Sequence, residues 1–368
     1  MRKSNSVVDT RQEFASGTVQ ERDNAKSNSL NGSINLEWTV FDGFAMFVGY
    51  DKVKELSELG KLNTRMTLEN LASRIATEYY NLIRQIQLIN SLHYGLKLSK
   101  ERLAIASEKY KIGSFSRLEY LQAQGDFNAD SSRYLRQEET VNASKILLSK
   151  TLAYNLNIPK TWQDTILINK DLDIELLLKK TLDNNTGLLI ANQSKLLSEL
   201  DIKLIRSRYY PSLSLNSGFN YTNSESQSGF LLSNQTTGWT YGASLTFNIF
   251  NRFDNHRQIR NARIENENRE LELQNLKQEI TNELNQIWNV YTSSLRVLSL
   301  ETSNLEWARE NLDIAMTKYR LGSLAGIEMR EIQKNYLDAS SRYIEARYLA
   351  KIAEINLKQI SGEIQDYF

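Results

Sequence analysis

The sequence has no cysteine, only two histidines and only two prolines among its 368 residues. Without cysteine there is no disulfide bond and no thiolate metal site. The two histidines, His93 and His256, are too few for a histidine-rich metal centre. We therefore predict no metal site and no cofactor. The scarcity of proline permits very long uninterrupted helices, because proline removes a backbone donor and breaks a helix interior.

An excess of charge of one sign is also lacking, since 45 basic residues face 44 acidic ones. That balance gives no electrostatic reason to predict nucleic acid as a partner. No run of 18 apolar residues exists, so we predict no transmembrane helix. The mean hydropathy of −0.48 favours a soluble protein. Transmembrane β-strands also look polar on average, however, because only alternate residues meet lipid.

Enzyme signatures are absent as well. The sequence contains no phosphate-binding loop, no HExxH, no nucleophile elbow and no Cys/His pair. We predict that the chain is not an enzyme, and we assign no catalytic residue.

One feature that is present is an internal repeat. KYKIGS at residues 109–114 returns as KYRLGS at residues 318–323, a shift of 209 residues. At the same shift Gln124 falls on Gln333 and SSRY at 131–134 falls on SSRY at 340–343. A long register without gaps is typical of rigid helices, since one inserted residue would rotate the rest by about 100°. We interpret the repeat as duplication of one structural unit.

Each unit contains a segment in which apolar and polar residues alternate. These segments are residues 30–40 and 239–249, and a third covers 211–221. Alternation with period two predicts a strand with one apolar face. Ordinary strands have about 5–6 residues, so these longer, aromatic-bearing ones favour a membrane barrel over the alternative of a soluble β-sandwich. We expect a polar loop over about 222–237.

Long heptad patterns follow the strands. Apolar residues recur every seven positions in both units. They are Leu68, Ile75, Leu82, Ile89, Leu96, Leu103 and Tyr110, and then Leu284, Tyr291, Leu298, Leu305, Leu312 and Tyr319. The first pattern predicts a helix over about 45–111. Gly113 and Gly322 suit the left-handed conformation that ends a helix, and Ser114 or Ser116 is predicted to cap the next one.

Together these segments resemble the TolC-type outer-membrane channel family, also called outer-membrane efflux proteins. The resemblance rests on NLEWTVFDGF (35–44), SRYYPSLSL (207–215), LTFNIFNRF (245–253), KYKIGSFSRLEYLQAQ (109–124) and KYRLGSLAGIEMREIQ (318–333). It extends over nearly the whole chain. It implies a mixed α and β membrane protein with two repeats, whose antiparallel helical hairpins form a periplasmic tunnel and whose strands join one transmembrane β-barrel shared by a homotrimer. A few strands cannot close a barrel alone, and an open edge cannot lie in lipid.

The domain boundaries follow from this comparison. We expect a mostly loop segment over 1–28, a first repeat over 29–160 with one strand and a helical hairpin, and a second repeat over 161–368 with connecting helices, two strands and a hairpin. Only one strand is recognisable in the first repeat. Proteins of the family are longer, so we expect that the chain is truncated at its N-terminus.

The resemblance also implies roles for single residues. The turns would contact a periplasmic adaptor protein through Ile112, Gly113, Ser114, Leu321, Gly322 and Ser323; the alternative is a plain turn between helices. Glu119, Glu328 and Glu331 would form an acidic ring at the periplasmic entrance; the alternative is a solvated surface. Tyr319 would contact a tip carboxylate such as Glu119 in a closed state; the alternative is that it completes the heptad pattern.

The function implied is a passive exit duct for efflux or for type I secretion. It would lie in the outer membrane of a Gram-negative bacterium, in contact with outer-membrane lipid, with its helices in the periplasm. The adaptor would connect it to an inner-membrane transporter. The competing hypothesis is a soluble or peripheral coiled-coil scaffold, which would explain the heptads but not the alternating aromatic strands.

Overall fold

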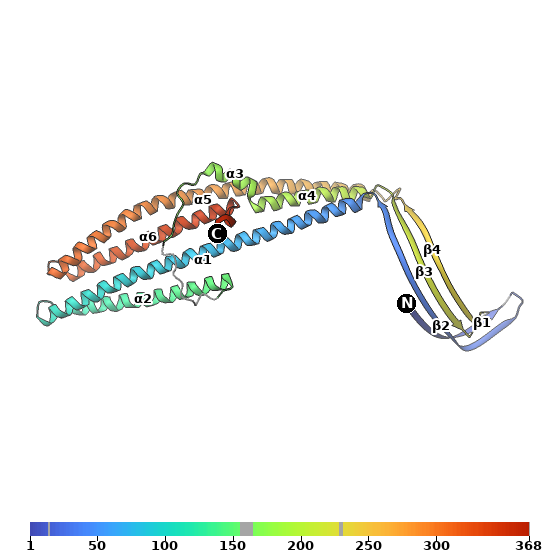
Figure 1. Cartoon of the computed structure of the whole chain (residues 1–368), viewed down its shortest axis with the longest axis horizontal. Helices are drawn as coiled ribbons and strands as arrows, with labels where there is room; N and C mark the ends of the chain where they lie inside the picture. Colours follow the sequence, from blue (N-terminus) through green and yellow to red (C-terminus); the bar gives the residue numbers. More distant parts are fainter. Residues whose placement is uncertain (14, 155–164, 228–230, 368) are drawn as a thin grey trace. The chain divides into compact units, whose positions relative to one another are not determined.

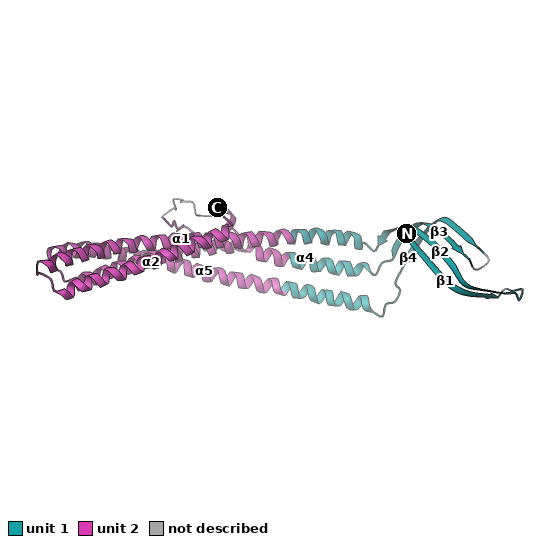
Figure 2. Ribbon diagram, turned by 90° about the horizontal axis from the view of Figure 1, so that it is seen from below, with its two compact units in different colours: residues 1–58, 193–270 teal, residues 59–192, 271–368 magenta. Residues whose placement is uncertain are grey.

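The computed structural model describes the chain except for residues 14, 155–164, 228–230 and 368. The described residues form two compact units, which are interleaved in the sequence. Unit 1 holds residues 1–58 and 193–270, and unit 2 holds residues 59–192 and 271–368 (Figure 2).

Unit 1 contains a four-stranded antiparallel sheet with the order β1-β2-β3-β4 (Figure 1). Its strands are β1 Arg2–Glu13, β2 Val19–Asp42, β3 Ser212–Ser226 and β4 Ser233–Thr246. The pairing within the sheet leaves one edge of β1 and one edge of β4 without a neighbouring strand of the described chain. Each strand is longer than the usual 5–6 residues.

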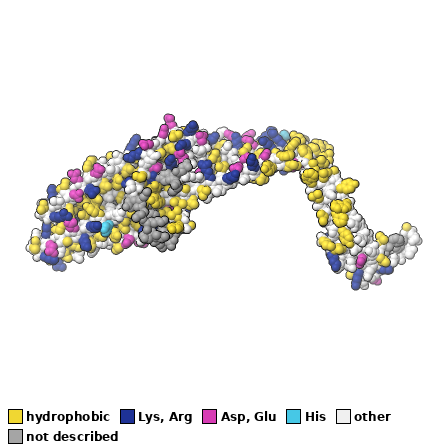
Figure 3. Space-filling model, viewed as in Figure 1, with side chains coloured by type: hydrophobic (Ala, Val, Ile, Leu, Met, Phe, Trp, Pro, Cys, Tyr) yellow, Lys and Arg dark blue, Asp and Glu magenta, His cyan; other side chains and the backbone are white. Residues whose placement is uncertain are grey.

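The register of β2, β3 and β4 separates apolar from polar side chains. Ile34 pairs with Phe219, which in turn pairs with Trp239. One position further along, Asn35 pairs with Gly218, the partner of Thr240. Because successive side chains of a strand point to opposite faces, the sheet has one apolar and one polar face. The apolar face is open: Ile34 is 75% and Trp239 is 73% exposed. Hydrophobic side chains gather over these strands in Figure 3.

Two expectations about this region are wrong. Residues 1–28 are not mostly loop, because they form β1 and the first part of β2, with Lys3 opposite Leu30 and Gln12 opposite Gln20. These segments are polar, so they lack the alternation of apolar and polar residues that predicts a strand. Their pairing comes from backbone hydrogen bonds, which form whatever the side chains are. The loop predicted over 222–237 is also shorter, since β3 continues to Ser226 and β4 begins at Ser233; residues 228–230 of that prediction lie outside the described residues.

The strand-to-helix junctions have the same backbone conformation in both places. Gly43 and Phe44 have φ of 69° and 72°, and Arg252 and Phe253, at the same shift of 209 residues, have φ of 57° and 62°. A long helix follows each junction: α1 Ala45–Lys111 and α5 Asp254–Leu321. Gly43 has a second constraint, because a Cβ at this position would lie 2.2 Å from the carbonyl oxygen of Ser207.

In unit 1, residues 193–207 of the helix α4 Thr186–Ser207 join α1 to α5. Lys52 of α1 forms an ion pair with Asp201 of α4. On the other side, the Ser198 hydroxyl of α4 lies 2.6 Å from Oδ1 of Asn266 in α5. These contacts hold the first turns of the long helices beside one another.

Unit 2 contains two antiparallel helical hairpins (Figure 1). The main part of α1 pairs with α2 Arg117–Leu152, and α5 pairs with α6 Gly326–Ile360. A connecting helix, α3 Ile174–Asn184, and a short 3-10 helix, η1 Ile364–Tyr367, complete the unit. The predicted helix over 45–111 is therefore observed with those bounds.

The core of unit 2 follows the heptad pattern predicted for the second hairpin. Leu284, Tyr291, Leu312 and Tyr319 are each at most 1% exposed. A cluster around Leu284 and Tyr291 packs with Leu357 of α6. In the part of the chain that the structure describes, no helix is both long and apolar enough to cross a membrane.

Candidate functional site at the helical tips

The two hairpin turns of unit 2 are built alike. In the first, Gly113 has φ +77°, and the amides of Gly113 and Ser114 donate to the carbonyl oxygens of Tyr110 and Lys109 over 3.0 and 2.8 Å. A glycine is favoured here because a left-handed residue with a Cβ is strained.

The second turn repeats that pattern at Gly322, which has φ +81°. The amides of Gly322 and Ser323 donate to the carbonyl oxygens of Tyr319 and Lys318 over 3.1 and 2.9 Å. Both glycines therefore end their helices as the sequence predicts.

The turns lie next to each other and expose apolar side chains. The ammonium group of Lys109 donates to the carbonyl oxygen of Tyr319 over 3.2 Å and lies 4.8 Å from the centre of the Phe115 ring. Ile112 and Leu321, one in each turn, are 77% and 79% exposed. Gly113, Ser114, Gly322 and Ser323 are exposed as well. The six predicted docking residues therefore form two adjacent, accessible tips.

Glu119 has a specific place in the first tip. Its Oε2 accepts hydrogen bonds from the Ser116 amide over 2.7 Å and the Ser116 hydroxyl over 2.9 Å, and the Glu119 amide donates back to that hydroxyl. This is a capping box that starts α2. Ser116 is therefore the cap, rather than Ser114. Glu119 is half-buried, whereas Glu328 and Glu331 in α6 are exposed.

Tyr319 is 1% exposed beneath the tips. It lines a pocket of about 230 Å³ together with Glu119, Arg102 and Arg330. Burial raises the pKa of the Tyr319 phenol; the charge of Arg102 opposes the rise and the charge of Glu119 adds to it. The structure thus brings Tyr319 and Glu119 to one pocket, while the Glu119 carboxylate is held by Ser116.

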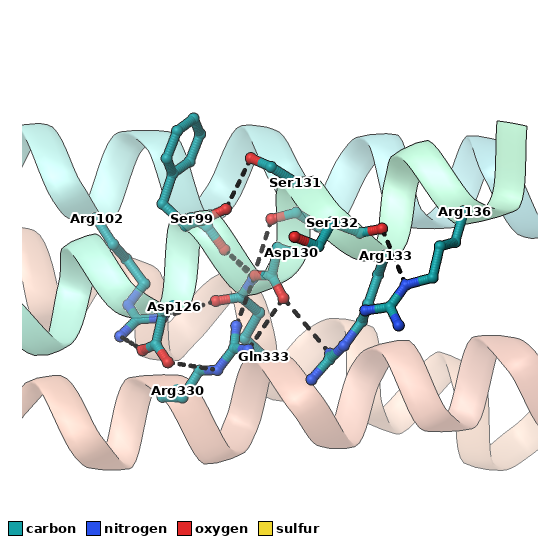
Figure 4. A network of polar contacts seen from close by, with 12 residues as sticks. Ser99, Arg102, Asp126, Asp130, Ser131, Ser132, Arg133, Arg136, Arg330 and Gln333 are labelled. Carbon is teal, nitrogen blue, oxygen red and sulfur yellow. Dashed lines mark hydrogen bonds and ion pairs between the residues drawn. The ribbon is translucent and has the colours of Figure 1, made fainter.

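A buried polar network that the sequence did not reveal joins α1, α2 and α6 close to the tips (Figure 4). The guanidinium group of Arg330 in α6 holds both oxygens of Asp130 in α2, at 2.6 and 3.0 Å. Ser99 of α1 also donates to Asp130. Arg102 of α1 forms an ion pair of 3.0 Å with Asp126 of α2.

Gln333 completes this network between the two hairpins. Its amide nitrogen donates to the Gly95 carbonyl oxygen and to the Ser99 hydroxyl of α1, over 3.0 and 2.8 Å, and its amide oxygen accepts from Arg102 over 3.0 Å. Gln333 is 0%, Arg102 3% and Asp130 4% exposed. The network therefore fixes α6 in the groove between α1 and α2.

Buried charges of this kind need partners. Burial raises the pKa of the Asp130 carboxyl, but hydrogen bonds from Arg330 and Ser99, and the charges of Arg330 and Arg133, outweigh it. The pKa of Asp130 consequently lies below its ordinary value of 3.8, and the group is ionised.

Sequence reasoning missed this network because it joins α6 to α1 and α2 across separations of 200 to 238 residues. The available signal was weak: Asp126 and Asp130 share a helix face at a spacing of four, next to the apolar positions of α2. Residue type also misleads here, since Leu118 and Leu121 of α2 are 65% and 49% exposed, whereas Asp130 is buried. Among the described residues, no three His, Cys, Asp or Glu side chains gather into a metal site.

A long-stranded sheet with an open apolar face, followed by long helical hairpins that end in paired tips, defines the class of outer-membrane channels with a helical tunnel. The model of the outer membrane efflux protein family matches residues 177–363. This is just over half of the chain, and the chain belongs to that family. It is accordingly a protein of the outer membrane of a Gram-negative bacterium, with its helical part in the periplasm.

Several known proteins are similar to this chain in sequence or in fold. The cation efflux system protein CusC of Escherichia coli O6:H1 is 21% identical over 355 residues, which cover 91% of this chain and 72% of that protein. The CmeC outer membrane channel of Campylobacter jejuni has a TM-score of 0.76 at 16% identity, covering 98% of this chain and 77% of that one. The MtrE outer membrane channel of Neisseria gonorrhoeae has a TM-score of 0.71 at 13% identity, covering 99% and 81%.

Proposed function

We propose that the protein is the passive exit duct of a tripartite efflux system and works as a homotrimer. The observation that carries this proposal is the sheet of unit 1. Within the described part of the chain, it has an exposed apolar face, a polar opposite face, and outer edges of β1 and β4 that pair with no other strand. In lipid every backbone donor and acceptor must be paired, so these edges need strands from further copies of the chain.

In this proposal, three copies close one barrel, with β1 of one copy beside β4 of the next. The apolar rows that contain Ile34 and Trp38 then face lipid. The polar rows that contain Asn35 and Glu37 face the lumen, since strands of such barrels alternate in this way. The helices continue the duct in this proposal. Each chain supplies two equivalent repeats, and each repeat consists of strands followed by a helical hairpin.

The tips are the part of the duct that we propose to meet an adaptor. Ile112 and Leu321 offer two exposed apolar side chains on rigid turns. Removing apolar side chains from water when two surfaces come into contact favours association. An adaptor seated there would connect the duct to an inner-membrane transporter, which supplies the energy. Because the family and the relatives named above are efflux proteins, we favour efflux over type I secretion.

We further propose that Glu328 and Glu331 ring the periplasmic entrance. Both are exposed on α6 near the second tip, and they share one helix face. Rings of carboxylates favour cations over anions. Glu119 adds its charge beside Tyr319 in the pocket beneath the tips, and its hydrogen bonds with Ser116 hold the first tip together. We assign the opening of the duct from a closed state to a rearrangement of the residues that line this pocket.

Reconstitution tests the function and the ring together. The purified protein should run as a trimer after chemical cross-linking and should give stepwise conductance in a planar bilayer under a salt gradient. The reversal potential should indicate cation preference, and the double variant Glu328→Gln and Glu331→Gln, which keeps side-chain size, should reduce it. Absence of both a trimer and conductance would overturn the duct. Unchanged selectivity in a conducting double variant would place the two glutamates away from the entrance.

A further inference from the structure

Among the described residues, no helix fills one stretch of the groove between α5 and α6, whereas α6 fills the equivalent groove between α1 and α2. The empty stretch is a pocket of about 650 Å³, and its lining includes Asn304, Ala308, Asn311, Asn335 and Ala339. Subtracting the shift of 209 residues gives Gly95, Ser99, Arg102, Asp126 and Asp130. These five residues are the ones that α6 contacts in the first groove through Leu337, Gln333 and Arg330.

The same shift identifies what should fill the empty groove. Gln333, the residue of α6 that enters the first groove, corresponds to Gln124 of α2. Gln333 is 0% exposed, whereas Gln124 is exposed. The difference continues along the helix: Ile344 and Ile355 of α6 are 5% and 0% exposed, but their counterparts in α2, Leu135 and Ile146, are 61% and 70% exposed. The face of α2 that corresponds to the buried face of α6 therefore lacks a partner within the described chain.

The side chains of the two grooves have changed together. In the filled groove, Arg330 pairs with Asp126 and Asp130. In the other set, Leu121 stands in place of Arg330, and Asn335 and Ala339 stand in place of the two aspartates. At these three positions the arginine and both carboxylates are thus lost at once, so that none of them leaves a buried charge without its partner.

A second matched change concerns the size of the side chains. Gly95 makes room for Leu337, since a Cβ on Gly95 would lie 2.9 Å from both Leu337 methyl carbons. At the corresponding positions stand Asn304 and Asn128. A large and a small residue are therefore replaced by two of intermediate size, which can pair as amides.

We infer that helix α2 of a second copy of this chain occupies the groove between α5 and α6, with Gln124 in the place that Gln333 takes within the chain. The groove is lined by Asn304, Asn311 and Asn335 together with the apolar Trp307 and Ile314 and the charged Lys318, Asp338 and Arg342. It lacks the counterpart of the Arg330 pairing with Asp126 and Asp130 inside each chain. Repeating this contact head to tail joins each copy to the next through different surfaces, as a closed ring requires. The inference rests on the proposed multi-copy duct and names the residues of its subunit interface.

The absence of cysteine makes a cross-linking test direct. Two differently tagged full-length chains, one carrying Gln124→Cys and the other Ala308→Cys, are produced together and treated with a short bis-methanethiosulfonate linker. We expect a covalent dimer carrying both tags in the mixture and no dimer with either variant alone. Replacing Ala308→Cys by Glu306→Cys, which lies on another pocket of α5, should remove the product. Ser99→Cys with Gln333→Cys in one chain should link internally and shows that the reagent spans the distance.

A charge-restoring pair gives a second readout. Leu121→Arg should reduce the trimer fraction, because it buries an arginine without a partner. Adding Asn335→Asp should restore the trimer by reproducing the Arg330–Asp126 pair. A trimer by amine cross-linking that lacks the mixed cysteine product, or that Asn335→Asp fails to restore, would overturn the inference while leaving the duct standing. A wild-type chain that forms no oligomer would overturn both.

Discussion

Asp130 shows how much of this protein depends on single buried residues. Its carboxylate connects three helices, because it accepts from Ser99 of α1 and Arg330 of α6 while belonging to α2. A carboxylate that is 4% exposed is tolerated only because these donors surround it. Losing it leaves Arg330 without its bidentate partner.

We expect Asp130→Asn to lower the free energy of unfolding by about 3 kcal/mol at neutral pH, the usual cost of breaking a buried ion pair. Asp313→Asn, at an exposed position of α5, should change it by less than about 0.5 kcal/mol. Thermal unfolding followed by circular dichroism of the helices measures both. Equal stability of the two variants would mean that the network contributes nothing to the fold.

The pH dependence of this difference has a definite sign. The pKa of Asp130 is depressed in the folded protein, so its stabilising effect is complete above the ordinary value of 3.8 and is lost as the pH falls through the lower folded pKa. The wild type should therefore lose more stability than Asp130→Asn below pH 3.8. A gap between the two proteins that stays constant or widens on acidification would contradict this assignment.

The strand-to-helix junction is the critical point at the scale of elements. Gly43 has φ +69° and packs against the backbone of Ser207. At the corresponding position Arg252 keeps a side chain at φ 57°. The left-handed conformation alone is therefore tolerated in this fold, and the close approach of Ser207 is what requires glycine at residue 43.

Gly43→Ala should reduce the stability of the folded protein by more than about 2 kcal/mol, since the clash adds to the left-handed strain of about 1–2 kcal/mol. Gly49→Ala is the matched control, because nothing lies within 4 Å of a Cβ there. As Gly49 lies inside α1, alanine should stabilise that helix by about 0.5–1 kcal/mol. Opposite signs in thermal unfolding are expected, and a stabilising Gly43→Ala would show that the junction adapts.

For the whole molecule, the two faces of the sheet determine where the chain can assemble. Leu245 and Ser244 are neighbours in β4, and they pair with Leu213 and Ser214 of β3 on opposite faces. Leu245 is 69% exposed on the apolar face. The proposed barrel places that face against lipid and the Ser244 face against the water-filled lumen.

Leu245→Arg should therefore destabilise the folded, membrane-inserted protein by about 2–4 kcal/mol if the residue lies near the bilayer midplane. Ser244→Arg, with the same added charge one residue away, should be tolerated better. Heat-resistant trimer on gels, after folding into lipid vesicles, gives the comparison. Equal losses from the two substitutions would mean that the apolar face does not meet lipid.

The local features of this protein were determined by its sequence. The bounds of α1 and the conformations of Gly113 and Gly322 agree with prediction, because heptad spacing and left-handed turns depend on residues that are close in the chain. For the residue that caps α2, the sequence left two candidates, Ser114 and Ser116. The hydrogen bond between the Glu119 carboxylate and the Ser116 hydroxyl identifies Ser116 as the cap.

Only the tertiary structure decided which distant residues meet. β1 was missed because its pairing with β2 comes from backbone hydrogen bonds between polar segments. The network around Asp130 was missed because its partners are separated by up to 238 residues, as between Gly95 and Gln333. A local pattern carries no information about such partners, because burial of a polar side chain depends on what the rest of the chain brings to it. The same reason explains why an empty groove between α5 and α6 became visible only once α6 was seen to fill the other one.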